Sequence, residues 1–340
     1  MAAQRKRARL HEILAFAAVY VIWGSTYLAI RVGVETLPPL LLAGSRFLLA
    51  GTVVYGVLRL RGAPAPTAGH WKRSGLAGIV MLVFGNGLVT WAETRLPSNL
   101  AALLVAAVPL YVAGIDWLRP GGVRPPRPVV IGILLGAAGM VLLVRPDPAA
   151  AHPTSVLGVL AMLLAGLSWA SGSLYARYAR QHPHALVAGA QQMLVAGVVL
   201  LVGSALRGEV AAFRPEAVSL RSWVAFGYLT VFGSMVAFSA FSWLVTSTSP
   251  ARVSTTAYVN PVVAVFLGWL ILGETLHPAA SAGAGLIVCA VIIMVTTRRA
   301  RPYSTVGVPS RKPVPKKRRI AARAAASSVE TKCPSRPAPP

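Results

Sequence analysis

Residues 13–31 read ILAFAAVYVIWGSTYLAIR, a mainly apolar run that carries no charge before its final arginine. A helix needs roughly 20 mainly apolar residues to cross a hydrocarbon core about 30 Å thick, so this run predicts a membrane-spanning helix. The run is too long for the apolar part of a signal peptide, and it lacks a convincing small-residue cleavage site. The basic N-terminus, residues 1–12, is expected to lie in the cytoplasm.

Similar runs recur along the chain, in which 55% of the 340 residues are hydrophobic and 12% are charged. Soluble proteins carry about twice that share of charged residues, so lipid is the expected solvent. Backbone polar groups in lipid must be bonded within their own segment, which favours helices. Ten segments qualify as spans: 13–31, 38–58, 75–93, 98–118, 128–144, 155–176, 185–206, 221–244, 251–272 and 278–297. The sequence therefore predicts an all-α membrane protein with ten transmembrane helices.

The formal net charge of +24 does not indicate a nucleic-acid partner, because the basic residues sit at the chain ends and in short loops between apolar runs. With the N-terminus in the cytoplasm, most of the 33 basic residues fall on the cytoplasmic side. The outer loops then hold most of the acids. An even number of spans places both termini in the cytoplasm, which predicts a multi-pass protein of the cell (inner) membrane.

The segment 301–340 is rich in Pro, Ala, Ser and basic residues and has almost no apolar run that could pack. We expect it to be a disordered, basic cytoplasmic tail. The stretch 311–319 either attracts anionic lipid headgroups or serves only to fix the topology of the chain.

Two halves of the sequence share landmarks in the same order. Trp23 and Trp169 each precede an arginine at the edge of a span, and Pro109 and Pro261 each lie within the fourth span of a half. The halves, 13–144 and 155–297, are therefore predicted to be two five-helix repeats. An odd number of spans in each repeat forces opposite orientations, which is typical of secondary transporters that hold their substrate near mid-membrane.

Several stretches resemble a known family and together cover most of residues 13–297. They are Trp23–Arg31 (WGSTYLAIR), Ala43–Phe47 (AGSRF), Gly85–Gly87 (GNG), Ala257–Val265 (AYVNPVVAV) and Leu272–Glu274 (LGE). With them the sequence resembles the EamA-domain transporters of the drug/metabolite transporter superfamily, and among these the YedA-like inner-membrane proteins.

The resemblance implies two inverted five-helix repeats around a central cavity, and export or exchange of small metabolites or amphipathic compounds. The sequence departs from the family pattern at 119–122, which read RPGG where many relatives repeat the LGE triplet. Glu274 therefore lacks a symmetric acidic partner, and a role that needs a matched pair of carboxylates is not expected.

Arg46 lies within the second span, about 13 Å from its start. A cation at that depth costs roughly 2.5–3.5 kcal/mol, so it should face the bundle interior or a wet cavity. It either binds an anionic group of a substrate or forms an ion pair, for which Glu93 is the candidate partner. Glu93 in turn is an ion-pair partner, an ordinary loop acid, or a proton-binding group.

Polar and kinked positions occur in the middle of other spans. The two glycines beside Asn86 favour either close helix packing or a locally opened backbone that lines a cavity. Asn86 itself either hydrogen-bonds a substrate or joins two helices. Asn260 precedes Pro261, and proline removes a backbone donor and kinks a helix. Pro109 and Pro261 are therefore candidate hinges, and Asn260 is a candidate substrate-binding residue.

Aromatic and amide side chains supply the remaining candidates for a substrate-binding cavity. Aromatic rings offer apolar faces to amphipathic ligands, although they also anchor helices at the membrane interface or pack between them. Further candidates for substrate binding are Trp23, Tyr27, Trp91, Trp169, Gln192 and Tyr258.

Several other activities find no support in the sequence. It has no phosphate-binding Gly-Lys-Ser/Thr loop, and no metal-ligating cluster, so neither a cofactor nor a metal is expected. The histidines fall in loops or at span edges, which disfavours an enzyme acting on lipid. A non-transporting sensor or scaffold stays an alternative, and it predicts a bundle without a central cavity. The glycines of 132–139 either pack helices of one chain or support a homodimer.

Overall fold

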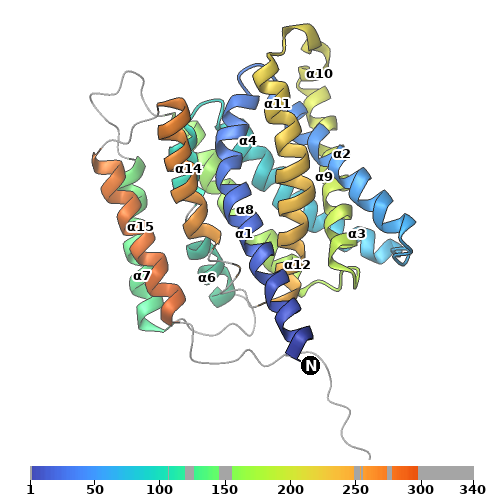
Figure 1. Cartoon of the computed structure of the whole chain (residues 1–340). Coiled ribbons are helices and arrows are strands. Elements are labelled where there is room, and N and C mark those ends of the chain that lie inside the picture. The colour runs from blue at the N-terminus through green and yellow to red at the C-terminus, as the bar shows by residue number, and fades with distance from the viewer. Residues whose placement is uncertain are drawn as a thin grey trace, which may run out of the picture. The chain divides into compact units, whose positions relative to one another are not determined.

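The apolar runs fold into helices along the whole described chain, because each helix bonds its own backbone groups. The computed structural model describes residues 2–105, 107–118, 126–144, 155–248, 253, 256–273 and 278–297 (Figure 1). Regular structure in these residues is entirely helical, and they belong to one unit, Met1–Arg298. The predicted tail 301–340, Glu274 and the RPGG segment lie largely or wholly outside the described residues.

The helical elements of the described chain include two π-helical segments, η1 and η3. The elements are α1 (Ala2–Gly33), α2 (Pro39–Leu60), α3 (Ala68–Gly78), η1 (Ile79–Gly87), α4 (Leu88–Ala92), α5 (Ser98–Val105), α6 (Val108–Leu118), α7 (Arg127–Val144), α8 (Val156–Tyr178), α9 (Ala185–Leu206), α10 (Glu209–Ala212), η2 (Pro215–Ala217), α11 (Leu220–Tyr228), η3 (Leu229–Phe238), α12 (Ser239–Ser247), α14 (Thr256–Leu272) and α15 (Pro278–Thr297).

Seven helical stretches of the described chain are long and apolar enough to cross a membrane. They are Leu10–Gly33, Pro39–Leu60, Ala68–Ala92, Leu100–Leu118, Val156–Tyr178, Ala185–Leu206 and Leu220–Ser247. The other three predicted spans coincide with α7, α14 and α15. Their apolar stretches are shorter, Val130–Gly139, Val262–Ile271 and Ser281–Ala290. The described part of this membrane protein is thus all-helical, with seven candidate spans and three shorter apolar helices.

Two of the spans contain a π-helical segment at mid-length, which the sequence pattern did not predict. In Ala68–Ala92 the chain passes from α3 through η1 into α4, and in Leu220–Ser247 it passes from α11 through η3 into α12. Within η3 the side-chain hydroxyl of Ser234 donates to the carbonyl of Leu229, five residues back, at 3.0 Å. π-Helical turns are rare and occur frequently at functional sites.

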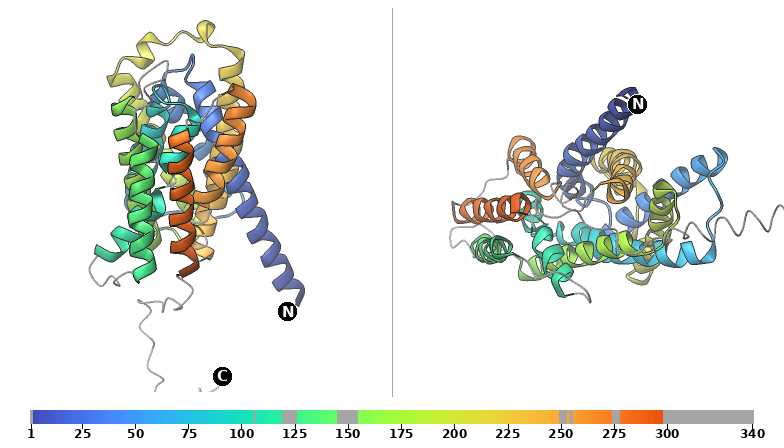
Figure 2. Two further views of the ribbon diagram at one scale, coloured as in Figure 1. Left: turned by 90° about the vertical axis from the view of Figure 1, so that its left-hand side faces the viewer. Right: turned by 90° about the horizontal axis from the view of Figure 1, so that it is seen from below.

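The helices of the two halves pack against each other in pairs. α2 packs along α9, and α7 packs along α15 at one edge of the bundle (Figure 2). α1 packs on η3 and α14, which belong to the second half. α8 packs on η1, α5 and α6, which belong to the first half. Each half therefore places its first helix against the π-helical span of the other half.

Small residues let α2 and α9 approach closely. A Cβ on Gly197 of α9 would lie 2.5 Å from the backbone nitrogen of Leu48 in α2, so only glycine fits there. At one end of the pair the carboxylate of Glu209 accepts from the backbone N–H of Leu41 at 3.0 Å and from the hydroxyl of Ser204 at 2.9 Å. Within the predicted small-residue face of α7, a Cβ on Gly136 would meet the side chain of Leu110 at 2.5 Å, so that glycine packs on α6 of the same chain.

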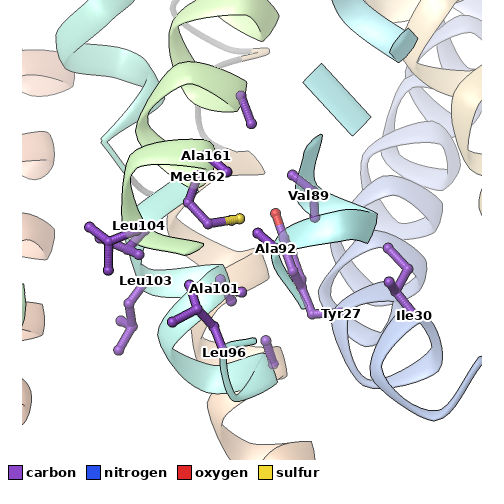
Figure 3. Close-up of a cluster of buried hydrophobic side chains, with 14 of the residues drawn as sticks. Tyr27, Ile30, Val89, Ala92, Leu96, Ala101, Leu103, Leu104, Ala161 and Met162 are labelled. Carbon is purple, nitrogen blue, oxygen red and sulfur yellow. The ribbon is translucent and has the colours of Figure 1, made fainter. Parts of the chain in front are cut away.

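The buried apolar side chains form two clusters, one on each side of the bundle centre. The first contains Tyr27 and Ile30 of α1, Val89 of α4 and Met162 of α8 (Figure 3). The second joins α2, η1, α9 and η3 through side chains such as Phe238. A space lined by side chains from several of these elements lies at the bundle centre.

The two opposite ends of the bundle are called the Arg31 face and the Arg177 face, after the arginine that each contains. The Arg31 face holds the ends of α1 and α4, since Arg31 donates to the backbone carbonyl of Glu93. The Arg177 face holds the end of α8 and the start of α3, since Arg73 donates to the backbone carbonyl of Arg180 at 3.1 Å. α1 ends at one face and α8 at the other, so the two helices run in opposite directions.

Candidate central cavity

A cavity of about 110 Å³ lies where the two halves meet. Its lining comes from α1, α2, η1, α4, α5, α6, α8, η3 and α14, so both halves contribute to it. Most of the lining is apolar, and a few polar side chains face into it. This composition is typical of sites that bind small organic molecules. A bundle without a central cavity, as a scaffold would have, is not what the structure shows.

Arg46 forms the polar part of the cavity wall. Its side chain is only 2% exposed, and its guanidinium donates to the side-chain carbonyl of Asn86. The Nε of Arg46 has no hydrogen-bond partner in the described part of the chain. The carboxyl group of Glu93, also buried, is close enough to interact electrostatically with Arg46. The cation therefore lies in the bundle interior, as predicted, and one of its donors is buried without a partner in the described part of the chain.

Three aromatic rings form a cluster at the cavity, two of which, Trp23 and Trp169, line it. The ring of Trp23 lies 5.4 Å from that of Trp169 and 4.8 Å from that of Phe241, and the last two are 5.5 Å apart. The indole N–H of Trp23 donates to the carbonyl of Gly233 at 3.2 Å, which fixes the ring against η3. Rings arranged in this way present broad apolar faces to an amphipathic molecule.

A second cavity, of about 80 Å³, lies beyond this aromatic cluster on the way to the Arg177 face. Trp169 lines both the first and the second cavity, and Phe241 lines the second. Pro109, the predicted hinge of the first half, also lines the second cavity. The aromatic cluster therefore stands between the two spaces, and Trp169 borders each of them.

A third cavity, of about 250 Å³, opens at the Arg177 face. Gln192 lines it and donates to the side chain of Gln181 at 3.0 Å. His182 also lines it, and burial, with the nearby charges of His70 and His184, holds the pKa of His182 below its ordinary value. Arg177 lines the second and the third cavity, so the two spaces meet at its side chain.

The structure brings most of the predicted binding residues to one place. Trp23, Tyr27, Arg46, Asn86, Trp169 and Asn260 all line the central cavity. Trp91 does not line any of these three cavities. Its ring stacks instead with the guanidinium of Arg95 at 3.9 Å. Gln192 lies at the third cavity, away from Arg46. The side chains of Tyr258 and Pro261 lie outside the described residues, although both positions fall within α14.

Some lining residues were missed in the sequence analysis. Phe241 completes the aromatic cluster, and Ser234 and Thr256 add hydroxyl groups to the central cavity. No periodicity distinguishes these side chains from ordinary apolar or small residues of a span. For Ser234 one signal was available, because Gly233–Ser234 follows Trp169 in the second half much as Gly85–Asn86 follows Trp23 in the first.

The chemistry that this arrangement supports is the binding of an organic molecule. The cavity combines one buried cation, amide and hydroxyl groups, and aromatic faces. No group of three or more metal-ligating side chains occurs among the residues that the structure describes. A solute with a hydrogen-bond-accepting or anionic group and an apolar body would match the polar and the aromatic groups of the lining.

Comparison with known protein families gives two consecutive matches to one family model. Residues 10–145 and 156–296 each match the EamA-like transporter family. One model thus fits the chain twice, with the junction between α7 and α8.

Known proteins similar to this chain include the uncharacterized inner membrane transporter YedA of Escherichia coli K12. The two are 40% identical over 296 residues, which cover 87% of this chain and 94% of YedA. The uncharacterized transporter YoaV of Bacillus subtilis is 24% identical over 84% of this chain and 97% of its own length. A solved crystal structure covers 85% of this chain and 99% of its own, with a TM-score of 0.61 and 22% identity, which is a likeness of fold.

Proposed function

This chain belongs to the EamA-like transporter family and is a membrane transporter, and we propose that it moves a small organic solute by alternating access. In this proposal the ten helices form two inverted five-helix repeats, 13–144 and 155–297, with both termini in the cytoplasm. The direction is export, and the solute is a small metabolite or an amphipathic compound. The observation that carries the proposal is the central cavity at the junction of the two halves.

The packing of the halves supports the repeat. α1 packs on η3 and α8 packs on η1, so corresponding helices make corresponding contacts in the two halves. α1 and α8 end at opposite faces, as an inverted repeat requires. Such an arrangement places the solute at the junction of the two halves, where movements of their helices can open one face at a time.

The cavity wall supports the class of solute. Arg46, whose side chain lines the cavity, would bind an accepting or anionic group, and the cluster of Trp23, Trp169 and Phe241 would contact an apolar body. Placing a cation within the membrane costs free energy, so the presence of Arg46 at the cavity fits a role in binding. Glu93 then moderates the charge of Arg46 when no solute is bound.

The aromatic cluster would act as the barrier on the Arg177 side of the solute. It stands between the central and second cavities, and Trp169 borders both. A rearrangement of these rings would join the two spaces and give the solute a path toward the third cavity. The hinge position Pro109 lines the second cavity, where such a movement would be needed.

Flux through purified protein in liposomes tests the proposal. A panel of small carboxylated, neutral and cationic solutes with apolar groups is loaded, and release is measured without ATP. We expect release of at least one solute above empty liposomes, and a fall of about tenfold or more with Arg46→Gln, because a hydrogen bond to a charged group is lost. Arg95→Gln is the matched control, since Arg95 is exposed and stacks on Trp91.

Two results would contradict the proposal. The first is no flux of any solute above empty liposomes while the protein remains folded. The second is equal loss of flux in Arg46→Gln and Arg95→Gln, which would place recognition outside the cavity.

A further inference from the structure

Two arginines occupy matching places in the two halves, and neither serves the solute site described above. Arg31 stands as many residues after Trp23 as Arg177 stands after Trp169. Each lies in the last turn of the first helix of its half, α1 or α8. Both side chains are half-buried, and each donates to backbone carbonyls.

Arg31 bonds the end of the π-helical span of its own half. Its Nη1 donates to the backbone carbonyl of Glu93 at 2.6 Å, and Glu93 caps the C-terminus of α4. Carbonyls at a helix C-terminus lack partners within the helix and carry a partial negative charge. A guanidinium at this position therefore ties α1 to the end of the α3–η1–α4 span.

Arg177 makes the same contact in the second half. Its Nη1 donates to the carbonyls of Val245 at 3.1 Å and Thr248 at 3.4 Å. Val245 lies in the last turn of α12, and Thr248 caps that helix. The guanidinium therefore ties α8 to the end of the α11–η3–α12 span.

The two contacts lie at opposite faces of the bundle. Arg31 reaches residue 93, at the end of the α3–η1–α4 span, whereas Arg180, next to the end of α8, accepts from Arg73 near the start of that span. The two ends are separated by roughly 30 Å at 1.5 Å per residue. One contact therefore closes helix ends at the Arg31 face, and the other closes helix ends at the Arg177 face.

We propose that Arg31 and Arg177 are paired latches, one for each gate of the alternating-access cycle. Each latch holds the first helix of its half to the end of a π-helical span, and each releases when the gate at its own face opens. This inference rests on the proposed function. Arg31 and Arg177 are positioning residues: they set which face is open and do not select the solute.

The type of bond suits a latch that must open in every cycle. Both arginines donate hydrogen bonds to neutral backbone carbonyls, which are less costly to break inside the protein than a buried ion pair. The position of Arg177 adds a second argument. Its side chain lines both the second and the third cavity, so a solute moving between these spaces must pass it.

Sided labelling of a single cysteine tests the latches without a transported solute. Cys289 and Cys333 are replaced by serine, and Ala165→Cys places a thiol in the central cavity wall, where Ala165 is buried. A membrane-impermeant maleimide is applied to intact cells and, separately, to inverted vesicles. The ratio of the two labelling rates reports which gate is open.

We expect Arg177→Gln to raise labelling from the Arg177 face about tenfold relative to the other face, and Arg31→Gln to move the ratio as far in the opposite direction. Arg177→Lys and Arg31→Lys keep a charged donor and should restore most of the wild-type ratio. A general loss of stability would move both variants the same way, so the opposite signs separate a latch from a merely structural role.

Three outcomes decide between the two proposals. Opposite shifts, rescued by lysine, support the latches even if no solute in the liposome panel is transported. Robust flux with a labelling ratio that neither variant changes overturns the latches and leaves the proposed function standing. Shifts of the same sign in both variants also overturn the latches.

Discussion

The two π-helical segments share their geometry but differ in chemistry. η1 contains Gly85–Asn86 and η3 contains Gly233–Ser234. Asn86 accepts a hydrogen bond from Arg46 on another helix, whereas Ser234 donates to a carbonyl of its own segment. The first half thus supplies the charged group of the cavity, and the second half supplies a hydroxyl group already satisfied internally. The shared π-helical geometry of the two halves and the recognition of a solute therefore depend on different residues.

The aromatic residues show a similar difference. Trp169 lies against Gly85 of η1, with a ring atom 3.3 Å from where a Cβ would be, and Trp23 lies against Gly233 of η3. The indole of Trp23 also donates to the carbonyl of Gly233. Each half therefore places one tryptophan on the π-helical segment of the other, and one of the two contacts includes a hydrogen bond.

The largest effect should come from exchanging the polar residue of each π-helical segment. Asn86→Leu leaves the buried guanidinium of Arg46 without its amide partner, and we expect a loss of about 2–3 kcal/mol in stability. Ser234→Ala should cost about 1 kcal/mol or less, since its bond lies within one segment. Unfolding midpoints in detergent measure both. Equal losses would show that the halves are also alike in chemistry.

The second prediction concerns the glycines that precede each π-helical segment. A Cβ on Gly78 would lie 2.4 Å from the backbone carbonyl oxygen of Gln192, whereas a Cβ on Gly227 would meet nothing within 4 Å. Gly78→Ala should therefore destabilise the protein by about 2 kcal/mol through overpacking. Gly227→Ala should be neutral or stabilise it by up to about 1 kcal/mol, because alanine favours the helix.

Thermal unfolding of the two alanine variants in one detergent provides the measurement. Similar midpoints for Gly78→Ala and Gly227→Ala would mean that the approach of α9 to α3 is looser in the membrane than the structure shows.

The third prediction separates the two tryptophans. Trp23→Phe removes the donor to the carbonyl of Gly233 and keeps a ring, so it should cost about 1 kcal/mol more than Trp169→Phe. Both variants keep most of the aromatic contact with Phe241. Chemical or thermal unfolding of the pair tests the difference. A larger loss in Trp169→Phe would indicate that packing on Gly85 outweighs the hydrogen bond.

The smallest effect concerns the pH dependence of stability, which we expect to arise at the Arg177 face. The described histidines lie toward the Arg177 face, and burial, with the charges of His70 and His184, lowers the pKa of His182 below 6.5. A lowered histidine pKa adds stability that is fully present above pH 6.5 and is lost as the pH falls below it. The unfolding midpoint should therefore fall by about 1–2 °C more in the wild type than in His182→Gln between pH 7.5 and 5.5.

The exposed His184 provides a control for this pH effect, because His184→Gln should keep most of the wild-type dependence. An unchanged pH dependence in His182→Gln would show that another group titrates in this range.

The sequence predicted the helices well where apolar length alone determines them. The predicted span 185–206 coincides with α9, and 278–297 coincides with α15. The interior position of Arg46 was also predicted, because an isolated charge at that depth has few other places to lie.

Features that depend on contacts between helices were beyond the sequence. Phe241 has the same periodicity as any apolar residue of a span, and only the packing of α12 shows that it faces Trp23. Trp91 was expected in the cavity, but the local turn directs it to Arg95. The π-helical segments were likewise not predicted, since neither composition nor spacing separates them from an α-helix. The two-repeat organisation and the orientation of the termini stay proposals.

The wide turns of η1 and η3 have a mechanical consequence. A π-helical turn holds one extra residue compared with an α-helical turn. The position of this wide turn can shift along the helix when its hydrogen bonds exchange. Each such step would rotate only the residues between the old and the new position of the wide turn, by roughly 100°, without unwinding the helix. Asn86 would then turn away from Arg46 while both ends of its span kept their contacts. Faster amide exchange at 79–87 than in α9 would reveal this movement.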